Sequence, residues 1–553
     1  MHIERIKSKQ GKKVYTQILL RESYREPGAP RSAVKKRTLL NLTKYPAKDV
    51  QALQLALKYK NDLAKLQEIL AGQIELKQGP SVGAVWVLYR LCQDIGLTKA
   101  LGRSQNALLT LWMVMARLID QGSRLSAVRL AHEHAGPEIL GLSDFCEDDL
   151  YKAMDWLNRG QEQIEKRLFS LRPSQQKPEL FFYDVTSSYL EGEQNELANY
   201  GYNRDKKRGK KQIVIGLLCD EKGEPVSIEV FEGNTADLST FESQVKKASE
   251  RFGCERVTFV GDRGMIKSGQ IENLSEAGFH YITAITKAQI RALIKRNVIQ
   301  LGLFDEELCE IEHGGVRYIL RKNPIRADEM AKTRASKLAA VRDMAEKQNQ
   351  YLAAHPRADV YRAWRLVSEK EGRLGLSDWV TVKAKDRRII IEVDEEYLAE
   401  IAELDGCYVI KTDLPDEAAD MDTIHDRYKD LAQVERAFRN MKTGHLEVRP
   451  VFVRNAERTR AHVFIVMLAY RLRLVLEEAW RFLDITVEEG LKQLSTLCAI
   501  QTMIGAEAGC LSVPTPRDSV AELFKALDIS PPQTLPRRKG KVDTKRKLQS
   551  RRK

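Results

Sequence analysis

The sequence lacks the features of a secreted or membrane-bound protein. Its 8 cysteines are scattered over 553 residues, and no two form a Cys-x-x-Cys pair, which argues against a disulfide framework or a cysteine-rich zinc site. No uninterrupted apolar run has the length of about 20 residues that a membrane-spanning helix needs. The first ten residues lack the apolar core of a signal peptide. We therefore expect a cytosolic protein without a membrane partner.

Acidic residues are outnumbered, and the excess of positive charge is concentrated at the two ends. The formal net charge is +13 and the pI is about 9.1, which favours a polyanionic partner without naming one. Residues 1–46 hold 12 Lys or Arg against 3 acids, and residues 536–553 hold 10 against 1. Each end is either a solvated basic surface or a DNA contact, and the basic tail 536–553 is expected to be disordered.

Periodicity divides the rest of the chain. Residues 1–46 contain two β-prone runs that indicate a hairpin-like unit, and residues 47–172 have helical spacing throughout. Such a helical region commonly positions DNA, although no clean helix-turn-helix signature is present. Residues 173–178 form a linker with two prolines, after which the pattern changes to that of strands.

The strand-rich part predicts a mixed sheet. Residues 179–286 have the order β-β-β-α-β-α-β, which is the order of the ribonuclease H-like fold before its final helix. Residues 287–415 then read as a β-rich insertion domain, and residues 416–482 supply the awaited helix. Residues 483–535 are expected to be helical. The prediction is an α+β multidomain protein, with a ribonuclease H-like core interrupted by the insertion and preceded by a helical DNA-binding region.

Three carboxylates stand out within this order. Asp184 lies in the apolar run Leu180-Phe-Phe-Tyr-Asp184-Val, and Asp262 ends a second apolar strand. A carboxylate is unfavourable to bury among such side chains unless a cation meets it. Glu435 lies on the expected final helix. Taken singly, each is equally a strand cap or a salt-bridge partner, but adjacent strands would bring the two aspartates together. Two Mg²⁺ ions held by such carboxylates are suited to phosphodiester chemistry.

The helix around Glu435 has a patterned face. Tyr428, Leu431, Glu435 and Lys442 lie at i, i+3, i+7 and i+14, on one face of a continuous helix. Arg439 follows Glu435 by four residues on the same side. Tyr428, Arg439 and Lys442 are candidate phosphate contacts. The alternative is an ordinary solvated amphipathic helix.

Two further basic features are candidate DNA contacts. The run from Gly201 to Lys211 carries Lys206, Lys207, Arg208, Lys210 and Lys211 beside the aromatic residues Tyr200 and Tyr202. Arg263 follows Asp262 directly and either reaches a phosphate or pairs with an acid. The alternative for the run is a solvated loop.

Taken together, these motifs resemble those of DDE transposases of the IS4 superfamily, most closely the IS1634-type insertion-sequence transposases. The resemblance rests on Asp184-Val-Thr-Ser, Gly233-Asn-Thr-Ala-Asp237, Gly261-Asp262-Arg-Gly264 and the Tyr428, Glu435, Lys442 signature, and it covers essentially the whole chain. Leu431 replaces the Arg of the IS4 signature, so that phosphate contact would fall to Arg427, Arg436 or Arg439.

The resemblance implies transposition. Asp184, Asp262 and Glu435 would hold two Mg²⁺ ions, with Mn²⁺ as a substitute. The protein would bind inverted-repeat ends as a dimer or larger assembly in the bacterial cytosol or nucleoid, cut them and join the 3′-hydroxyls to target DNA. Some relatives flip a base against a tryptophan, but Trp364 and Trp379 are more often core residues and neither is assigned that role. Two other hypotheses stay open: a DNA-binding protein that has lost transposition, and a nuclease that cuts without joining.

Overall fold

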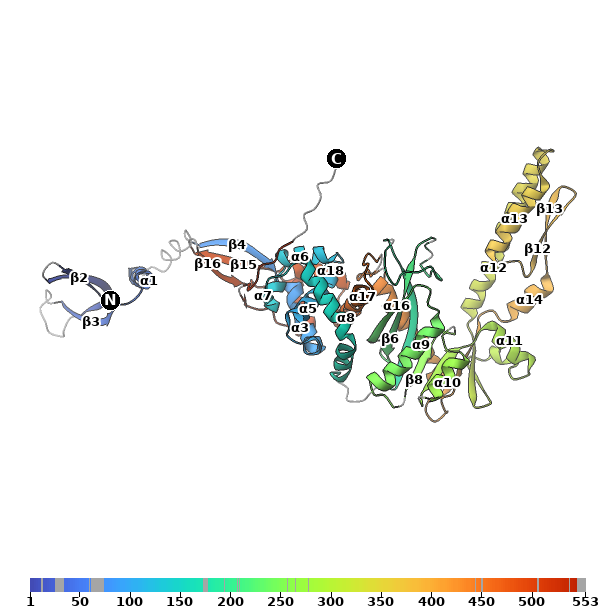
Figure 1. Ribbon diagram of the computed structural model, residues 1–553, viewed down its shortest axis with the longest axis horizontal. Helices are drawn as coiled ribbons and strands as arrows, with labels where there is room; N and C mark the ends of the chain where they lie inside the picture. The colour runs from blue at the N-terminus through green and yellow to red at the C-terminus, as the bar shows by residue number, and fades with distance from the viewer. Residues whose placement is uncertain are drawn as a thin grey trace.

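The computed structural model spans residues 1–553. It describes all of them except 11–12, 25–33, 59, 61–73, 173–177, 193, 206, 208, 256, 264, 277, 443, 449–450, 505–506, 537 and 545–553. A small N-terminal sheet lies at one end of the long axis, the main body lies in the middle, and an arm built on α12 and α13 rises at the other end (Figure 1). Among the described residues, no helix combines the length and the apolar character needed to cross a membrane.

The N-terminal region is a small antiparallel sheet with one helix. Strands β1 (His2–Gln10), β2 (Lys13–Tyr24) and β3 (Lys35–Asn41) pair in that order, and α1 (Ala47–Lys58) contacts β1. Leu19, Leu42 and Val50 are its buried residues, whereas all of β3 is exposed.

The region that follows is mainly helical. It contains α3 (Gly83–Asp94), α4 (Leu97–Leu101), α5 (Gln105–Ile119), α6 (Arg124–Glu133), α7 (Gly136–Leu140) and α8 (Glu147–Ser170). Residues 47–172 were expected to be helical throughout, but they also include strand β4 (Ile74–Ser81). This strand pairs with β15 near the other end of the chain, a partner that local periodicity does not reveal.

A large mixed sheet forms the centre of the body. Among the described residues, eight strands pair in the order β10-β11-β14-β9-β8-β5-β6-β7. Strands β5 (Leu180–Tyr189), β6 (Gln212–Asp220) and β7 (Pro225–Phe231) are antiparallel neighbours, whereas β8 (Thr258–Gly261) and β9 (His280–Ala284) run parallel to β5. Helices α9 (Asp237–Lys246) and α10 (Ser268–Glu276) connect the parallel strands. The predicted mixed sheet with interspersed helices is confirmed.

Both faces of this sheet are buried. Phe181 and Tyr183 of β5 point to the side covered by α9 and α10, where the Tyr183 ring lies 5.9 Å from that of Phe241. Phe182 points to the opposite side, into the core shared with α16 and α17. Because side chains alternate along a strand, Asp184 lies on the same side as Phe182.

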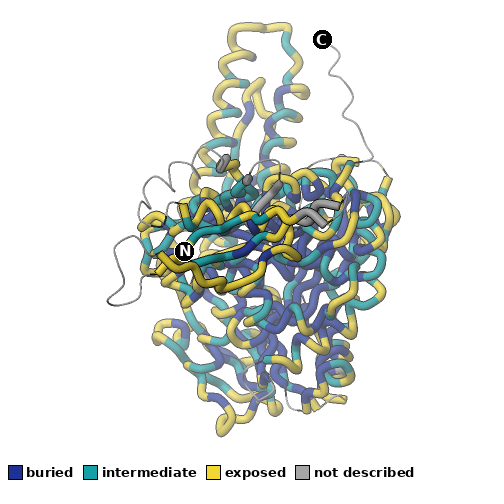
Figure 2. The backbone as a smooth tube through the Cα atoms, turned by 90° about the vertical axis from the view of Figure 1, so that its left-hand side faces the viewer, coloured by how far each residue is buried: buried dark blue, intermediate teal, exposed yellow. Residues whose placement is uncertain are grey.

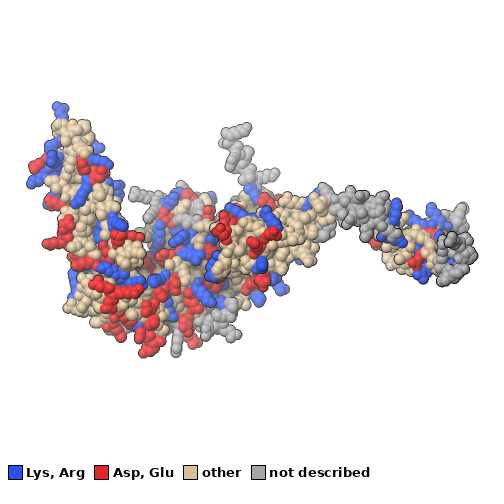
Figure 3. All heavy atoms as spheres, turned by 180° about the vertical axis from the view of Figure 1, so that it is seen from behind, with Lys and Arg blue, Asp and Glu red and all other residues tan. Residues whose placement is uncertain are grey.

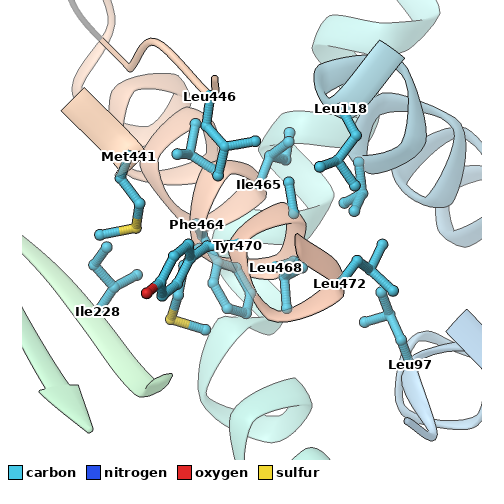
Figure 4. Close-up of a cluster of buried hydrophobic side chains, with 14 of the residues drawn as sticks. Leu97, Leu118, Ile228, Met441, Leu446, Phe464, Ile465, Leu468, Tyr470 and Leu472 are labelled. Carbon is cyan, nitrogen blue, oxygen red and sulfur yellow. The ribbon is translucent and has the colours of Figure 1, made fainter. Parts of the chain in front are cut away.

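That second core joins the sheet to the helical region. Helices α15 (Met421–Lys429), α16 (Ala432–Lys442) and α17 (Ala456–Ala479) contribute to it. Around α17, Phe464 and Ile465 pack among Met441, Ile228 and Leu118, which come from α16, β7 and α5 (Figure 4). The helical region is therefore packed against the side of the sheet that carries Asp184.

The predicted insertion, residues 287–415, contributes to two structures. After α11 (Lys287–Lys295), strands β10 (Cys309–His313), β11 (Val316–Lys322) and β14 (Cys407–Thr412) extend the large sheet beyond β9. Between β11 and β14, α12 (Pro324–Ala354), α13 (Val360–Leu374), β12 (Val380–Lys385), β13 (Arg388–Val393) and α14 (Glu395–Glu403) form the arm. The arm has its own hydrophobic core. Much of the arm's backbone belongs to exposed residues (Figure 2), and cationic and acidic side chains are interspersed over its surface (Figure 3).

The C-terminal part is mixed. Residues 483–535 were expected to be helical, but α18 (Val487–Ser495) and α19 (Asp518–Ala526) alternate with β15 (Cys498–Ile504), β16 (Glu507–Ser512) and β17 (Thr534–Leu535). The strands form a second sheet with β4. The described residues of the basic tail are packed instead of disordered: Arg538 pairs with Glu138 at 2.8 Å and Val542 is buried.

Candidate active site

The three predicted carboxylates lie at one edge of the large sheet. Asp184 is on β5, and Asp262 follows the last residue of β8. In the parallel pairing of these strands Tyr183 is opposite Gly261, so Asp184 and Asp262 are the next residues on neighbouring strands. Glu435 is on α16, which contacts β5 on the side to which Asp184 points.

Asp262 and Glu435 are close enough to Asp184 for their charges to act on it. Asp184 is half-buried, and its pKa is raised to about 7, mainly by burial and to a smaller extent by the negative charges of Asp262 and Glu435. The backbone N–H of Val185 and the charge of Arg204 act in the opposite direction. Asp262 and Glu435 are exposed. Asp184 is therefore the buried member of the group, and it lies within reach of the negative charge of the other two.

The donor set suits a hard divalent cation. Carboxylate oxygens from three separate elements are the ligands that Mg²⁺ and Mn²⁺ prefer, and a bound cation would relieve the repulsion that raises the pKa of Asp184. Within the described part of the chain, no three His, Cys, Asp or Glu side chains are already gathered at metal-binding distances. The carboxylates therefore fit such a group in their chemistry, without forming a closed ligand cage.

The helix expected to carry Tyr428 and Glu435 together is two helices. It is interrupted at Asp430 and Leu431, where the bonds from Leu431 N to Tyr428 O and from Gln433 N to Asp430 O span only three residues. Tyr428 lies in the last turn of α15, so the single helical face predicted for Tyr428, Leu431, Glu435 and Lys442 is wrong. Leu431 is buried at 8% exposure in the main core. The residue at the position where the IS4 signature has an arginine is therefore a core residue and not a surface one.

Tyr428 nevertheless reaches the site. Its hydroxyl lies 3.5 Å from Oδ1 of Asp262 and donates toward it. Burial raises the pKa of Tyr428, and the negative charge of Asp262 adds to the effect. The backbone N–H of Arg263 donates to the same Oδ1 at 2.7 Å, so two donors hold the Asp262 carboxylate in place.

Lys442, predicted as a phosphate contact, is buried beside the catalytic strand. Its Nζ lies 2.7 Å from Oδ1 of Asp205 and 2.9 Å from Oγ1 of Thr186, two residues after Asp184. The side chain of Asp205 is 2% exposed. Sequence reasoning missed Asp205 and Thr186, although an acid within a basic run was a visible signal. Lys442 thus links the end of α16 to β5 and to the loop of residues 201–211, called the basic loop below.

The basic loop lies along the end of β5. The backbone N–H of Arg204 donates to Ser187 at 3.0 Å, and its guanidinium pairs with Asp237 at 2.5 Å. Gly233 is required where this loop crosses, because a Cβ there would lie 1.8 Å from the carbonyl oxygen of Gln212.

The aromatic and cationic side chains of the loop face outward. Tyr200 and Tyr202 are 65% and 81% exposed. Lys207 lies over the ring of Tyr189, Lys210 pairs with Glu191, and Lys211 lies over the ring of Tyr200. Lys206 and Arg208 are outside the described residues. Of the described cations of the loop, Arg204 is the one whose charge acts on Asp184.

Other predicted residues are placed as follows. Arg263 and Arg439 are exposed, and Arg436 pairs with Glu477 of α17 at 3.2 Å. Trp364 and Trp379 lie in the core of the arm, where the indole N–H of Trp364 donates to the carbonyl of Val382 at 2.8 Å. These packed positions agree with a structural role for both tryptophans.

Comparisons with known proteins show the family to which the chain belongs. Residues 175–472 match the family model described as "Transposase DDE domain", and residues 3–69 match "IS1634 family transposase, N-terminal domain". No curated protein matches the chain. Among solved structures, one match is the cryo-EM structure of the piggyBac transposase synaptic complex with hairpin DNA. It has 9% identity and a TM-score of 0.34, and the match covers 76% of this chain and 82% of that one.

Proposed function

Because the chain belongs to the DDE transposase family, we propose that it cuts the inverted-repeat ends of an insertion sequence and joins the freed ends to target DNA. The observation that carries this proposal is that Asp184 and Asp262 follow paired positions on the neighbouring parallel strands β5 and β8, with α16 and its Glu435 packed on β5. The match of residues 3–69 to the IS1634 N-terminal domain supports an insertion-sequence substrate.

The core around these residues is proposed to be ribonuclease H-like. Its support is the strand order β7-β6-β5-β8-β9, with β5 to β7 antiparallel and β8 and β9 parallel to β5. In this interpretation residues 287–415 are an insertion that both widens the sheet and forms the arm, and α16 is the catalytic helix.

Each residue of the site has a role in the proposed reaction. Asp184, Asp262 and Glu435 would hold two Mg²⁺ ions, or Mn²⁺ in their place. When bound, such ions supply the activated water and the charge neutralisation that phosphodiester hydrolysis needs. Tyr428 keeps the Asp262 carboxylate oriented, and Lys442 keeps α16 against β5. The exposed cations of the basic loop hold the DNA backbone by charge.

The proposed chemistry has two steps, cleavage of the element's end and joining of that end to target DNA. Water adds across the bond between phosphorus and the 3′ oxygen, giving a 3′-hydroxyl and a 5′-phosphate. That hydroxyl then forms a bond to a phosphorus of the target strand and loses its proton to solvent, while the target's own bond to its 3′ oxygen breaks and that oxygen takes a proton from solvent to become a hydroxyl. Because two ends must be cut and joined together, we propose a homodimer or a larger assembly on DNA.

The test is cleavage of linear DNA that carries the element's own ends, with Mg²⁺ present. We expect the wild-type protein to leave 3′-hydroxyl ends and to join them to a second DNA. Glu435→Gln should slow cleavage by about a hundredfold or more, the equivalent of ~3 kcal/mol, while DNA binding persists. Asp430→Asn, which neutralises an exposed carboxylate five residues away, is the matched control.

Three other outcomes of this experiment would contradict the proposal. Binding without cleavage by the wild-type protein would favour a DNA-binding protein that has lost transposition. Cleavage without joining would favour a nuclease. Cleavage that survives Glu435→Gln would show that another group is the third carboxylate.

A further inference from the structure

A cationic pocket lies beside Asp262, separate from the three carboxylates. It has a volume of about 240 Å³, and Arg263, Lys267 and Lys411 line it. The first two come from the loop between β8 and α10, and Lys411 comes from β14. Among the described residues that line this pocket, none is acidic. A cavity with three positive charges and no negative one is suited to an anion.

The sheet register fixes the position of this pocket relative to the carboxylates. Lys411 is opposite Thr283 on β9, and Thr283 is opposite Gly261 on β8, the residue before Asp262. Neighbouring strands are about 4.8 Å apart, so Lys411 lies roughly 10 Å from the strand that Asp262 follows. This is about three steps of the 3.4 Å rise per nucleotide of a DNA strand.

The pocket opens on the opposite side of the sheet from Glu435. Residues in one row across a sheet point to the same face, and the row of Lys411, Thr283 and Gly261 continues to Tyr183. Tyr183 faces α9 and α10, whereas Asp184 faces α16. A double-stranded DNA lying over the sheet edge would therefore contact the carboxylates on one side and this pocket on the other.

The cations of the pocket are not neutralised by the protein. Lys411 is half-buried, burial lowers its pKa, and its Nζ lies 5.4 Å from the centre of the Tyr281 ring. In the part of the chain that the structure describes, no salt bridge involves Arg263, Lys267 or Lys411. By contrast, Arg317 on the neighbouring strand pairs with two acids. A partly desolvated charge without a counter-ion gains more from an anion than an exposed one.

The rest of the pocket limits the size of that anion. Ile266 and Ile285 are buried and form apolar walls. Thr286 and Gln289 complete the lining, but they form a reciprocal capping box at the start of α11, and so they already engage each other. The attraction for an anion therefore comes from the three cations and not from the helix end.

We propose that this pocket binds a phosphodiester group of the DNA backbone, on the opposite side of the sheet edge from the site of cleavage. The inference rests on the proposed function only as far as DNA binding. Its role is to hold the DNA in register with the carboxylates, so its contribution is to affinity and position and not to the chemical step.

The test is the salt dependence of DNA binding by the full-length protein, measured on a duplex that carries the element's end. A variant that loses one phosphate contact should lower the slope of log K against log [salt] by about one. We expect this change for Lys411→Met and for Lys267→Met, and we expect Lys411→Arg to keep the wild-type slope. Lys322→Met, which removes an exposed lysine from β11, is the matched control.

A second measurement identifies the phosphate. Neutral methylphosphonate linkages are placed one at a time along the duplex, and the loss of affinity is recorded at each position. We expect the wild-type protein to lose about fivefold to tenfold at one or two positions, and Lys411→Met to lose nothing further there. A pocket that binds only a free inorganic anion would show no position dependence, which would overturn the proposal.

These measurements do not require cleavage, so the two proposals can fail separately. An unchanged salt slope in both Lys411→Met and Lys267→Met would overturn the pocket even if the protein cuts DNA normally. The same slope change in Lys322→Met would also overturn it. Conversely, a position-specific effect without any cleavage would support the pocket and contradict the proposed transposition.

Discussion

The hydroxyl of Tyr428 lies 3.5 Å from Oδ1 of Asp262, although 166 residues separate them in the chain. Tyr428 is at the end of α15, just before the break that leads into α16 and Glu435. One segment therefore supplies both the third carboxylate and a side chain that steadies the second. This contact connects the end of β8 in the large sheet to α15, the helix that precedes the proposed catalytic helix α16.

We expect Tyr428→Phe to reduce DNA cleavage by about threefold to tenfold, because it removes one hydrogen bond of ~0.5–1.5 kcal/mol from the Asp262 carboxylate. DNA affinity should change by less than twofold, since the ring and its packing remain. Single-turnover cleavage with saturating protein separates the two effects. If affinity falls while the cleavage rate of bound DNA is unchanged, Tyr428 contacts DNA directly, as its sequence pattern alone suggested.

Lys442 gives a sharper distinction between a phosphate contact and a structural one. Its substitution by Met would leave the buried Asp205 without its cation, which typically destabilises a fold by about 3–5 kcal/mol. We expect Lys442→Met to lower the denaturation midpoint and the cleavage rate, and to leave the salt dependence of DNA binding unchanged.

The double variant Lys442→Met, Asp205→Asn should be more stable than Lys442→Met alone, since the buried negative charge that lost the Lys442 ammonium is gone. Lys429→Met, which removes an exposed lysine from α15, is the control and should leave both the denaturation midpoint and the cleavage rate as in the wild type. A weaker salt dependence in Lys442→Met, with normal stability, would restore the phosphate-contact hypothesis.

The sequence predicted those parts of the site that depend on local pattern. The apolar run Leu180–Val185 identified β5, and the apolar run before Asp262 identified β8. Placing both aspartates at one edge then required only that the two strands be parallel neighbours, which the order of elements suggested.

What the sequence did not predict depends on contacts between distant segments. The break at Leu431, whose side chain lies in the main core, is not visible on a helical wheel. The partner of Lys442 is 237 positions earlier, in a loop that reads as basic and solvated. Strand β4 was hidden for the same reason, because Thr502 and other partners on β15 are more than 400 residues away.

Metal binding should be visible as stabilisation. A ligand that binds only the folded state at ten times its dissociation constant adds about 1.4 kcal/mol to the free energy of unfolding. We expect Mg²⁺ and Mn²⁺ to raise the melting temperature of the wild-type protein, and Asp262→Asn to abolish most of that increase. Asp430→Asn should respond as the wild type does. An equal response in Asp262→Asn would mean that the cation binds elsewhere.

His462 predicts how the stability of the fold depends on pH. It is buried on α17, and its pKa is lowered well below 6.5 by burial and by the charges of Arg117 and Arg124. Below pH 6.5 the unfolded chain therefore takes up a proton that the folded protein does not, so this group makes the free energy of unfolding fall as the pH falls. Each pH unit in that range contributes up to about 1.4 kcal/mol.

We expect the wild-type protein to lose about 1.4 kcal/mol more than His462→Gln between pH 7.5 and pH 5.5, because the variant lacks the contribution of His462 to this loss. Urea denaturation at the two pH values measures this difference. His313→Gln, at an exposed position on β10, is the control. The same loss in the wild-type protein and in His462→Gln would show that His462 does not determine the acid sensitivity, and that other buried groups do.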